Sequence, residues 1–371
     1  MDADKPKQKK LYQVWRGSNR FFFGGRLVFG PDFKSLFLSA FLIAGPAITF
    51  CIKIMYIIKQ NKDVTSWYPL LIVAILLTIL DMFLLLVTAS RDPGIVPRNS
   101  KPPEFDELFE MSTPSMEWSD GTTPHLKLPP TRDVLVDGHT VKVKFCNTCL
   151  LYRPPRASHC YICNNCVQRF DHHCPWIGQC VGIRNYRFFY MFVSTSTILC
   201  AYVFVVSWID IVQTKRRWLK ALSKDVLSAV LIVYCFIVFW FIGGLTVFHL
   251  YLMSTNQTTH ENFRCRGRDE ENPYDKGIIK NIKEILLSEI PPSLNDFRAL
   301  VQEDQVTVTE SSAPSNFSQN ITSSKANSDF EKGDERSDSG LIFFSVEQEM
   351  AESVGSSATS EVEVIAQHAA G

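Results

Sequence analysis

Four long apolar runs dominate the pattern of hydrophobic and polar positions along the 371-residue chain. They span residues 36–58, 68–89, 188–212 and 226–253, and each exceeds the about 18–20 residues that a helix needs to cross a bilayer core. Buried helices of a soluble core are the alternative, but four such runs are not expected in one soluble domain. The pattern therefore predicts an α-helical polytopic membrane protein with four transmembrane helices.

A β-hairpin is predicted between the second and third apolar runs. Residues 134–136 and 141–145 alternate apolar and polar side chains, and the Asp-Gly pair at 137–138 between them is a preferred two-residue turn. We therefore expect the loop of residues 90–187 to contain a small, hairpin-rich domain at about 134–185.

The segments at the two ends of the chain are polar. Residues 1–35 form a basic arm, and residues 254–300 follow the fourth helix and include a short amphipathic helix predicted at 272–287. From 301 to 371, Ser, Thr, Glu and Asn dominate, and thirteen Asp/Glu face three Lys/Arg, a net charge of −10. Such a composition buries too little apolar surface to fold, so we expect an acidic, disordered tail.

The distribution of Lys and Arg predicts the orientation in the membrane. Eight basic residues precede the first helix and twelve lie in residues 90–187, whereas the loop between the first two helices holds only Lys59 and Lys62. Both termini and the cysteine-rich loop should then face the cytoplasm. Five basic residues in the loop at 215–224 argue against this orientation, which places them outside. The reducing cytosol suits thiols and bound zinc better than disulfides.

Cysteine and histidine are concentrated in one short segment. Seven of the eleven cysteines and three of the eight histidines fall between Cys146 and Cys180. Zinc takes four Cys or His ligands in a tetrahedral site, and pairs of cysteines in C-x2-C turns are typical zinc ligands. Two sites of three Cys and one His would use six cysteines and two histidines. If His173 is a ligand, Cys174 and His172 are left over.

The leftover thiol and imidazole follow Asp171 directly, and the three side chains have the composition of an activated nucleophile. Cys174 would attack as a thiolate, His172 would act as its base, and Asp171 would orient the imidazole. The alternative is a purely structural zinc module, since most Cys/His clusters are structural. A surplus thiol close to a surplus histidine at a membrane surface favours catalysis.

The spacing of these residues resembles one known family. The run C-x2-C-x9-H-C-x2-C-x2-C-x4-D-H-H-C-x5-C, placed between the second and third of four spans, resembles the DHHC family of protein S-acyltransferases. The segments around the spans are also similar: Asp92-Pro93-Gly94, Thr258-Thr259-His260-Glu261 as the TTxE motif, and Asn272-Pro273-Tyr274 with Asn281. The N-terminal arm is most similar to plant members.

The resemblance implies a palmitoyltransferase. Such an enzyme would transfer a long-chain acyl group, with palmitate expected, from acyl-CoA to cysteine thiols of proteins through an acyl-enzyme on Cys174. The implied partners are membrane-associated proteins with cytoplasmic cysteines, acyl-CoA and the lipid bilayer, and no nucleic acid. The hypothesis from another class is a zinc-stabilised membrane adaptor without catalysis.

The resemblance also implies two structural Zn²⁺ ions with interleaved ligands. Spacing alone would equally permit a sequential partition of the ligands along the chain. With four protein ligands each, the ions would be structural. One site would consist of Cys146, Cys149, His159 and Cys166, and the other of Cys160, Cys163, His173 and Cys180.

Further residues receive roles by the same resemblance. Thr259 would hydrogen-bond Asp171, and Asn281 would brace the C-terminal segment against the helices; a helix-end hydroxyl and a polar surface residue are the plainer interpretations. Glu261 and Asp92 belong to the supporting motifs.

Candidates for acyl-chain contacts are Trp176, Phe189 and Phe192. The alternative is an ordinary interface aromatic for Trp176 and packing for the two phenylalanines. Arg156 is a candidate for the CoA phosphates, with a solvated basic face as the alternative.

Two charged residues lie inside the apolar runs. Lys53 is near the outer end of the first run and is expected to snorkel or to meet Asp210 in the third. Asp81 is in the middle of the second run and is expected to find a hydroxyl group or to stay protonated.

The plant-like arm favours the plasma membrane as the location, with Golgi or endosomal vesicles as the alternative.

Overall fold

The computed structural model describes residues 8–60, 64–103, 129–213, 225–264 and 272–301. The predicted acidic tail beyond Val301 and the basic loop at 215–224 lie outside these residues. The chain divides into two units. One unit comprises residues 17–295 and holds the helices and the cysteine-rich segment, and the other joins the two ends of the chain.

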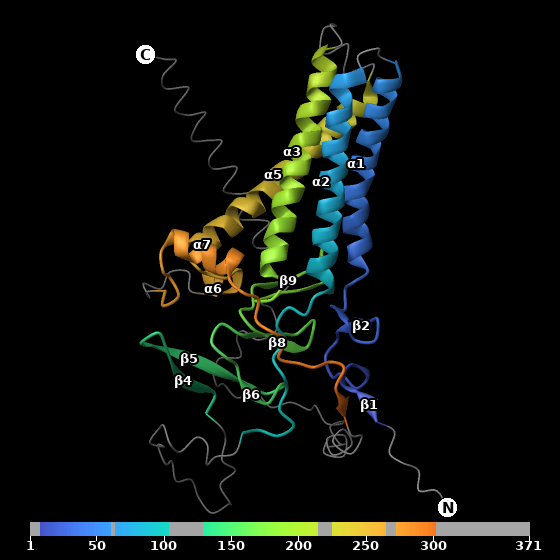
Figure 1. Cartoon of the computed structure of the whole chain (residues 1–371). Helices are drawn as coiled ribbons and strands as arrows, with labels where there is room; N and C mark the ends of the chain where they lie inside the picture. The colour runs from blue at the N-terminus through green and yellow to red at the C-terminus, as the bar shows by residue number, and fades with distance from the viewer. Residues whose placement is uncertain (1–7, 61–63, 104–128, 214–224, 265–271, 302–371) are drawn as a thin grey trace, which may run out of the picture. The chain divides into compact units, whose positions relative to one another are not determined.

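Four long helices form the core of the larger unit within the described residues, and each is long and apolar enough to cross a membrane. They lie side by side, and α1 contacts α2, α2 contacts α3, and α3 contacts α5 (Figure 1). Their outward faces expose large apolar side chains, as lipid contact requires. The four-helix prediction is therefore confirmed, with helices slightly longer than the predicted runs: α1 (Ser35–Gln60), α2 (Val64–Ser90), α3 (Tyr186–Gln213) and α5 (Val226–Ser254).

A polar layer separates two apolar clusters inside the helix bundle. One cluster includes Cys174 and Leu85, and the other includes Phe50 and residues of α3 from Leu199 onward. Between them lies Asp81, which is fully buried and whose two carboxylate oxygens accept the hydroxyl of Ser196, both at 2.9 Å. The expectation that Asp81 finds a hydroxyl group is confirmed.

The cysteine-rich segment consists of short antiparallel hairpins that lie at one end of the helices (Figure 1). In the first of these, Asp137 and Gly138 both have positive φ, of 47° and 83°, which is the turn that the Asp-Gly pair predicted. A third strand extends this sheet in the order β4-β5-β6. The strands are β4 (Thr131–Val136), β5 (His139–Cys146), β6 (Leu151–Tyr152), β7 (Ser158–Cys160), β8 (Asn165–Val167), β9 (His172–Cys174) and β10 (Gln179–Val181).

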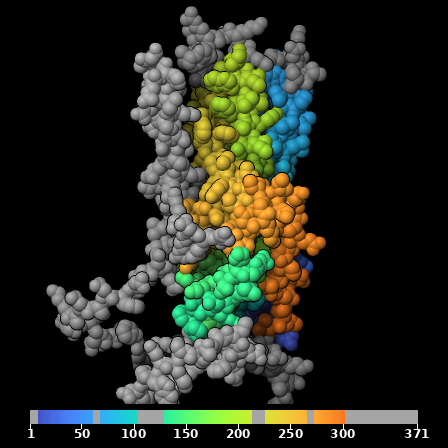
Figure 2. Space-filling model, turned by 90° about the vertical axis from the view of Figure 1, so that its left-hand side faces the viewer, coloured from blue at the N-terminus to red at the C-terminus, as the bar shows by residue number. Residues whose placement is uncertain are grey.

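The C-terminal segment contains two short helices, α6 (Thr259–Arg264) and α7 (Ile278–Leu287). The amphipathic helix predicted at 272–287 thus begins six residues late. Pro273 follows an Asn272 side chain that accepts the Tyr274 amide, and Gly277 has φ +89°, so this stretch is a turn. Figure 2 shows the C-terminal segment in orange against α5 in gold, where Asn281 donates to the carbonyl of Ser254 at 2.8 Å.

The basic N-terminal arm contains structure that the sequence pattern did not predict. Strands β2 (Arg20–Phe22) and β3 (Leu27–Phe29) form a hairpin in the larger unit. In the smaller unit, β1 (Lys9–Lys10) pairs antiparallel with β11 (Leu300–Val301), and Trp15 packs edge-on against Phe297. The two ends of the described chain are therefore joined.

An ion triad ties together the ends of three helices far from the cysteine-rich segment. The Lys53 ammonium of α1 lies 2.6 Å from Asp210 of α3 and 2.6 Å from Asp225, the N-cap of α5. The expected contact with Asp210 is confirmed, and Asp225 is a second partner that the sequence did not indicate. Lys53 is buried, and its ammonium supplies a positive charge to both carboxylates.

Replacement of Lys53 by methionine should destabilise the helix bundle. The variant removes the positive charge that both carboxylates face, which costs about 1–3 kcal/mol. The expected result is a lower unfolding temperature of the detergent-solubilised protein. Lys59→Met, at an exposed position near the end of the same helix, is the matched control. An unchanged unfolding temperature for Lys53→Met would contradict the proposed contribution of the triad.

Candidate active site and metal-binding clusters

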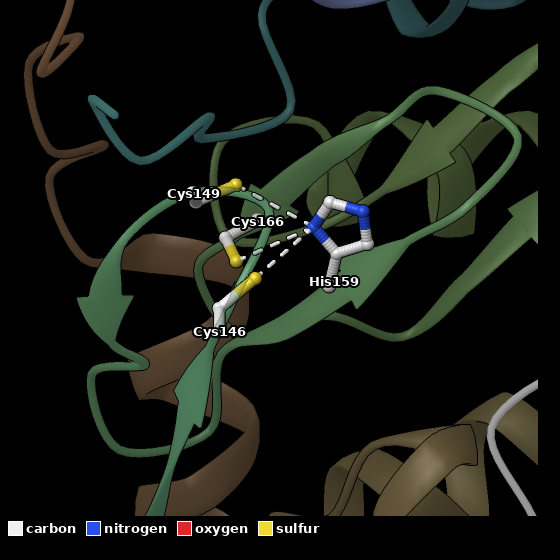
Figure 3. Close-up of side chains that lie close together, drawn as sticks. All are labelled: Cys146, Cys149, His159 and Cys166. Carbon is white, nitrogen blue, oxygen red and sulfur yellow. Dashed lines mark hydrogen bonds between the residues drawn. The ribbon is translucent and has the colours of Figure 1, made fainter. Parts of the chain in front are cut away.

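Two groups of four Cys and His side chains converge within the described part of the cysteine-rich segment. In the first group, Nδ1 of His159 lies 3.5 Å from the sulfur of Cys146, 3.5 Å from that of Cys149 and 3.7 Å from that of Cys166. Figure 3 shows the three sulfurs pointing at this one nitrogen. All four residues are buried, so the group is shielded from solvent.

The second group repeats this geometry with the next residues of the chain. Nδ1 of His173 lies 3.7, 3.4 and 3.6 Å from the sulfurs of Cys160, Cys163 and Cys180. The grouping is thus the interleaved one that the family resemblance implies.

The hairpins explain why the two groups interleave. In the β7–β8 hairpin His159 is paired with Cys166, and in the β9–β10 hairpin Cys180 is paired with His173. Each group therefore combines one cross-strand pair with the C-x2-C turn of the hairpin before it. The β5–β6 hairpin gives its turn to the first group, β7–β8 gives its strand pair to the first group and its turn to the second, and β9–β10 gives its strand pair to the second.

The second group has an additional partner outside the cysteine-rich segment. Nε2 of His173 lies 3.2 Å from a carboxylate oxygen of Asp32, just before α1. A carboxylate in this position fixes the ring so that Nδ1 faces the sulfurs. The close approach of the two segments requires Gly178, with φ +67°, because a Cβ there would lie 2.4 Å from the carbonyl oxygen of Asp32.

The leftover carboxylate, imidazole and thiol lie together beside this group. A carboxylate oxygen of Asp171 is 2.6 Å from Nδ1 of His172, and the buried Cys174 lies two residues further along β9, so its side chain is on the same face of the strand as that of His172. Asp171 is almost fully buried and accepts both the amide and the hydroxyl of Thr259, at 2.9 and 2.8 Å. The strand β9 and the start of α6 thus place the three groups in one row from Asp171 to Cys174.

The electrostatics of the row favour a charged pair. Burial alone would lower the pKa of His172, but the hydrogen bonds to Asp171 and Cys174 outweigh it and raise that pKa to about 10. Burial works to raise the pKa of Asp171, but the hydrogen bond to His172 dominates and holds it below the ordinary range. Both shifts favour an ionised carboxylate beside a protonated imidazole.

The backbone that follows Cys174 is fixed by contacts with α1, with the end of α2 and with β3. The hydroxyls of Ser35 and Ser39, on α1, donate to the carbonyls of Pro175 and Trp176. The buried amide of Gln179 lies 2.9, 3.0 and 2.8 Å from the carbonyls of Val28, Ala89 and Arg91. The turn after Cys174 is thus held by polar groups at the ends of α1 and α2.

Asp92, Asn185 and Arg184 connect this turn to α3. The carboxylate of Asp92 accepts the amides of Gly94 and Ile95 and pairs with Arg184 at 2.8 Å. The side-chain amide of Asn185 donates to the carbonyls of Cys180 and Thr88. Asp92 therefore connects the segment after α2 to the residues just before α3.

Arg156 has a different environment from the one expected. Its guanidinium forms two hydrogen bonds with Glu261, at 2.8 and 2.6 Å, and two with Asn256, and it lies 4.3 Å over the ring of Tyr274. These partners take up its donors, so we do not assign Arg156 to the CoA phosphates. These contacts instead attach the cysteine-rich segment to the residues that follow α5. Glu261 contributes to this attachment through its ion pair with Arg156.

The aromatic candidates for acyl-chain contacts separate into two environments. Phe189 and Phe192 are buried in the apolar cluster that contains Cys174. Trp176 is 38% exposed and is not among the buried residues of that cluster. Packing around the thiol therefore involves the two phenylalanines and not Trp176.

The sequence pattern missed His249 and Tyr186, which lie beside His172. His249 is buried in α5 and its Nδ1 lies 3.1 Å from the hydroxyl of Tyr186. Its ring centroid is 6.0 Å from that of His172. The available signal was the presence of a histidine inside the fourth apolar run.

Comparison with known proteins identifies the class that this fold and site define. A family model described as DHHC palmitoyltransferase matches residues 139–266. The chain is 54% identical over 317 residues to Probable protein S-acyltransferase 3 of Arabidopsis thaliana, covering 85% of this chain and 76% of that protein. Probable protein S-acyltransferase 2 of the same plant is 55% identical over 310 residues, covering 82% and 74% of the two chains.

A third relative agrees with these two. Probable protein S-acyltransferase 7 of Arabidopsis thaliana is 51% identical over 339 residues, which cover 90% of this chain and 74% of that protein. The chain is a multi-pass membrane protein, and it belongs to the DHHC palmitoyltransferase family. The similarity to plant members expected from the arm is borne out by these relatives.

Proposed function

We propose that this chain is a protein S-acyltransferase that carries a long-chain acyl group on Cys174. The observation that carries the proposal is the row of carboxylate, imidazole and thiol, in which Asp171 holds Nδ1 of His172 at 2.6 Å and the buried Cys174 lies on the same face of β9 as His172. A protonated imidazole beside a thiol stabilises the thiolate, which is the nucleophilic form. The names of the relatives support the same activity.

The reaction has two steps that exchange one thioester for another. The Cys174 thiolate attacks the carbonyl carbon of acyl-CoA, the bond from that carbon to the CoA sulfur breaks, and the departing thiolate takes the proton from His172. A cysteine thiol of the protein substrate then gives its proton to His172 and attacks the acyl group, and Cys174 leaves as a thiolate. Protons and electron pairs balance, and no ATP is required.

The surroundings of Cys174 support an acyl chain as the transferred group. The thiol lies in an apolar cluster with Leu36 of α1, Leu85 of α2 and Phe192 of α3. An acyl chain bound among these helices would bury apolar surface, and the exclusion of water would protect the acyl-enzyme from hydrolysis. Palmitoyl-CoA is the donor we expect.

The two Cys/His groups have the dimensions of zinc sites. Zinc bonds of about 2.3 Å to sulfur and about 2.05 Å to nitrogen in a tetrahedron put sulfur and nitrogen about 3.5 Å apart. The distances from His159 to its three sulfurs are 3.5, 3.5 and 3.7 Å, which fit this value. Three thiolates and one imidazole leave no open position, so we infer two structural Zn²⁺ ions that cross-link the hairpins.

The orientation and location follow from charge distribution. We infer that both termini and the cysteine-rich segment lie in the cytoplasm, where acyl-CoA and cysteines of membrane-associated proteins are available, and we favour the plasma membrane over Golgi or endosomal vesicles.

Cys174→Ser should abolish self-acylation and leave the fold intact. Purified protein is incubated with labelled palmitoyl-CoA and then treated with neutral hydroxylamine, which cleaves thioesters. We expect hydroxylamine-sensitive label on the wild type and none on the variant, with equal metal content. Cys51→Ser, inside α1, is the matched control and should be labelled normally. Equal labelling of Cys174→Ser would refute the role of Cys174; an unlabelled, folded wild type would support the adaptor hypothesis.

Cys146→Ser should lower the zinc content from about two ions per chain to about one, because a tetrahedral site that loses a thiolate binds metal much more weakly. Elemental analysis of the purified protein gives the ratio, and Cys51→Ser is again the control. A ratio that stays at two would show that Cys146 is not a ligand.

Topology can be measured in sealed membrane vesicles with the cytoplasmic side outward. Epitopes at either terminus should be removed by added protease without detergent, because the orientation places both outside the vesicle. Protection of either epitope would overturn the orientation. Separation of plasma membrane from Golgi and endosomal vesicles then tests the location.

A further inference from the structure

Two buried rings, those of Phe189 and His249, contact the imidazole of His172, and a third, that of Tyr186, packs against both of them. His172 packs edge-on against Phe189, with ring centroids 5.3 Å apart and an interplanar angle of 70°. His249 packs against the same phenylalanine at 5.0 Å and 77°. The two imidazole centroids are 6.0 Å apart, so His249 lies next to the row without belonging to it.

The position of His249 is fixed by a hydrogen bond from another helix. The Tyr186 hydroxyl lies 3.1 Å from Nδ1 of His249, and the tyrosine ring itself lies under the guanidinium of Arg169 at 5.7 Å. Tyr186, Phe189 and His249 are each at most 4% exposed. Tyr186 and Phe189 come from the first turn of α3 and His249 from α5, so this contact locks the two helices beside His172.

One hydrogen bond does not determine the orientation of an imidazole ring. Asp171 holds Nδ1 of His172, but the ring plane can still tilt about that bond, and its tilt decides whether Nε2 faces Cys174. Edge-to-face contacts have preferred angles and supply the missing restraint. Phe189 makes the edge-to-face contact with His172, and His249 lies beside His172 at an interplanar angle of 37° and packs edge-on against the same Phe189.

We propose that His249, held by Tyr186, is a positioning residue that keeps His172 aimed at Cys174. The proposal rests on the proposed function of Cys174 and His172 and deepens it. His249 acts through the packing of its ring, not by transferring a proton. Its removal should therefore slow acyl transfer without changing how tightly acyl-CoA binds.

The experiment measures self-acylation rates of the full chain at increasing palmitoyl-CoA concentrations. For His249→Ala we expect a maximal rate about tenfold lower, because a small misplacement of a catalytic group has effects of this size or larger. The half-saturating concentration should stay within about twofold of the wild-type value. His249→Phe restores a ring and should recover most of the rate. Val247→Ala, at an exposed position on α5, is the matched control.

Tyr186→Phe tests the hydrogen bond and remains informative if His249→Ala does not fold. Removal of the hydroxyl should lower the maximal rate in the wild type but have no further effect in the His249→Phe background, because the bond is already absent there. Additive effects of the two changes would overturn the proposal. So would a wild-type rate in His249→Ala, equal losses in His249→Ala and His249→Phe, or a change confined to the half-saturating concentration.

Parallel measurement of Cys174→Ser separates the two levels of the argument. Label that persists in Cys174→Ser refutes the proposed function and the positioning role with it. Label that depends on Cys174 but not on the ring at position 249 refutes the positioning role alone.

Discussion

A buried carboxylate stays ionised only if hydrogen-bond donors surround it. Asp171 is such a carboxylate, and the arrangement of the catalytic region depends on the donors that it requires. Its donors are the imidazole of His172 and the amide and hydroxyl of Thr259. The first comes from the cysteine-rich segment and the others from the segment just beyond the fourth membrane helix. The end of α5 must therefore dock on the cysteine-rich segment before His172 has a fixed partner.

Other contacts around the site are of the same kind: polar groups of the cysteine-rich segment bind polar groups near the ends of the membrane helices or in the N-terminal arm. Arg156 and Glu261 form a second link between the cysteine-rich segment and the end of α5. Gln179 binds carbonyls at the end of α2 and in the N-terminal arm. A cysteine-rich segment with short strands and a modest apolar core thus gains its rigidity from metal-binding groups on one side and from the ends of the membrane helices on the other.

The sequence predicted the features that depend on neighbouring residues. Apolar runs set the helices, the Asp-Gly pair set the hairpin, and the spacing of cysteines, with the family resemblance, indicated both metal groups. It could not predict which helix faces meet, because periodicity fixes a face but not its partner. Asp225 beside Lys53, Glu261 beside Arg156, and His249 beside His172 are all contacts of this kind. The turn before α7 is locally encoded, in Pro273 and Gly277, and the Asn-Pro pair indicated it.

Because the two metal-binding groups interleave along the chain, the same eight side chains could also bind two metal ions in a different, non-native grouping. Grouping Cys146 and Cys149 with His159 and Cys160 would also give three thiols and one imidazole, and the remaining four residues would form an equivalent set. The β7–β8 hairpin is incompatible with this grouping. The hairpin pairs His159 with Cys166, and the alternative grouping would assign these two cross-strand partners to different ions. A chain that binds metal before this hairpin forms would become a metal-scrambled isomer, the counterpart of a mispaired disulfide. Such an isomer would carry a full complement of ions and yet misplace Cys174, so metal content alone would not reveal it.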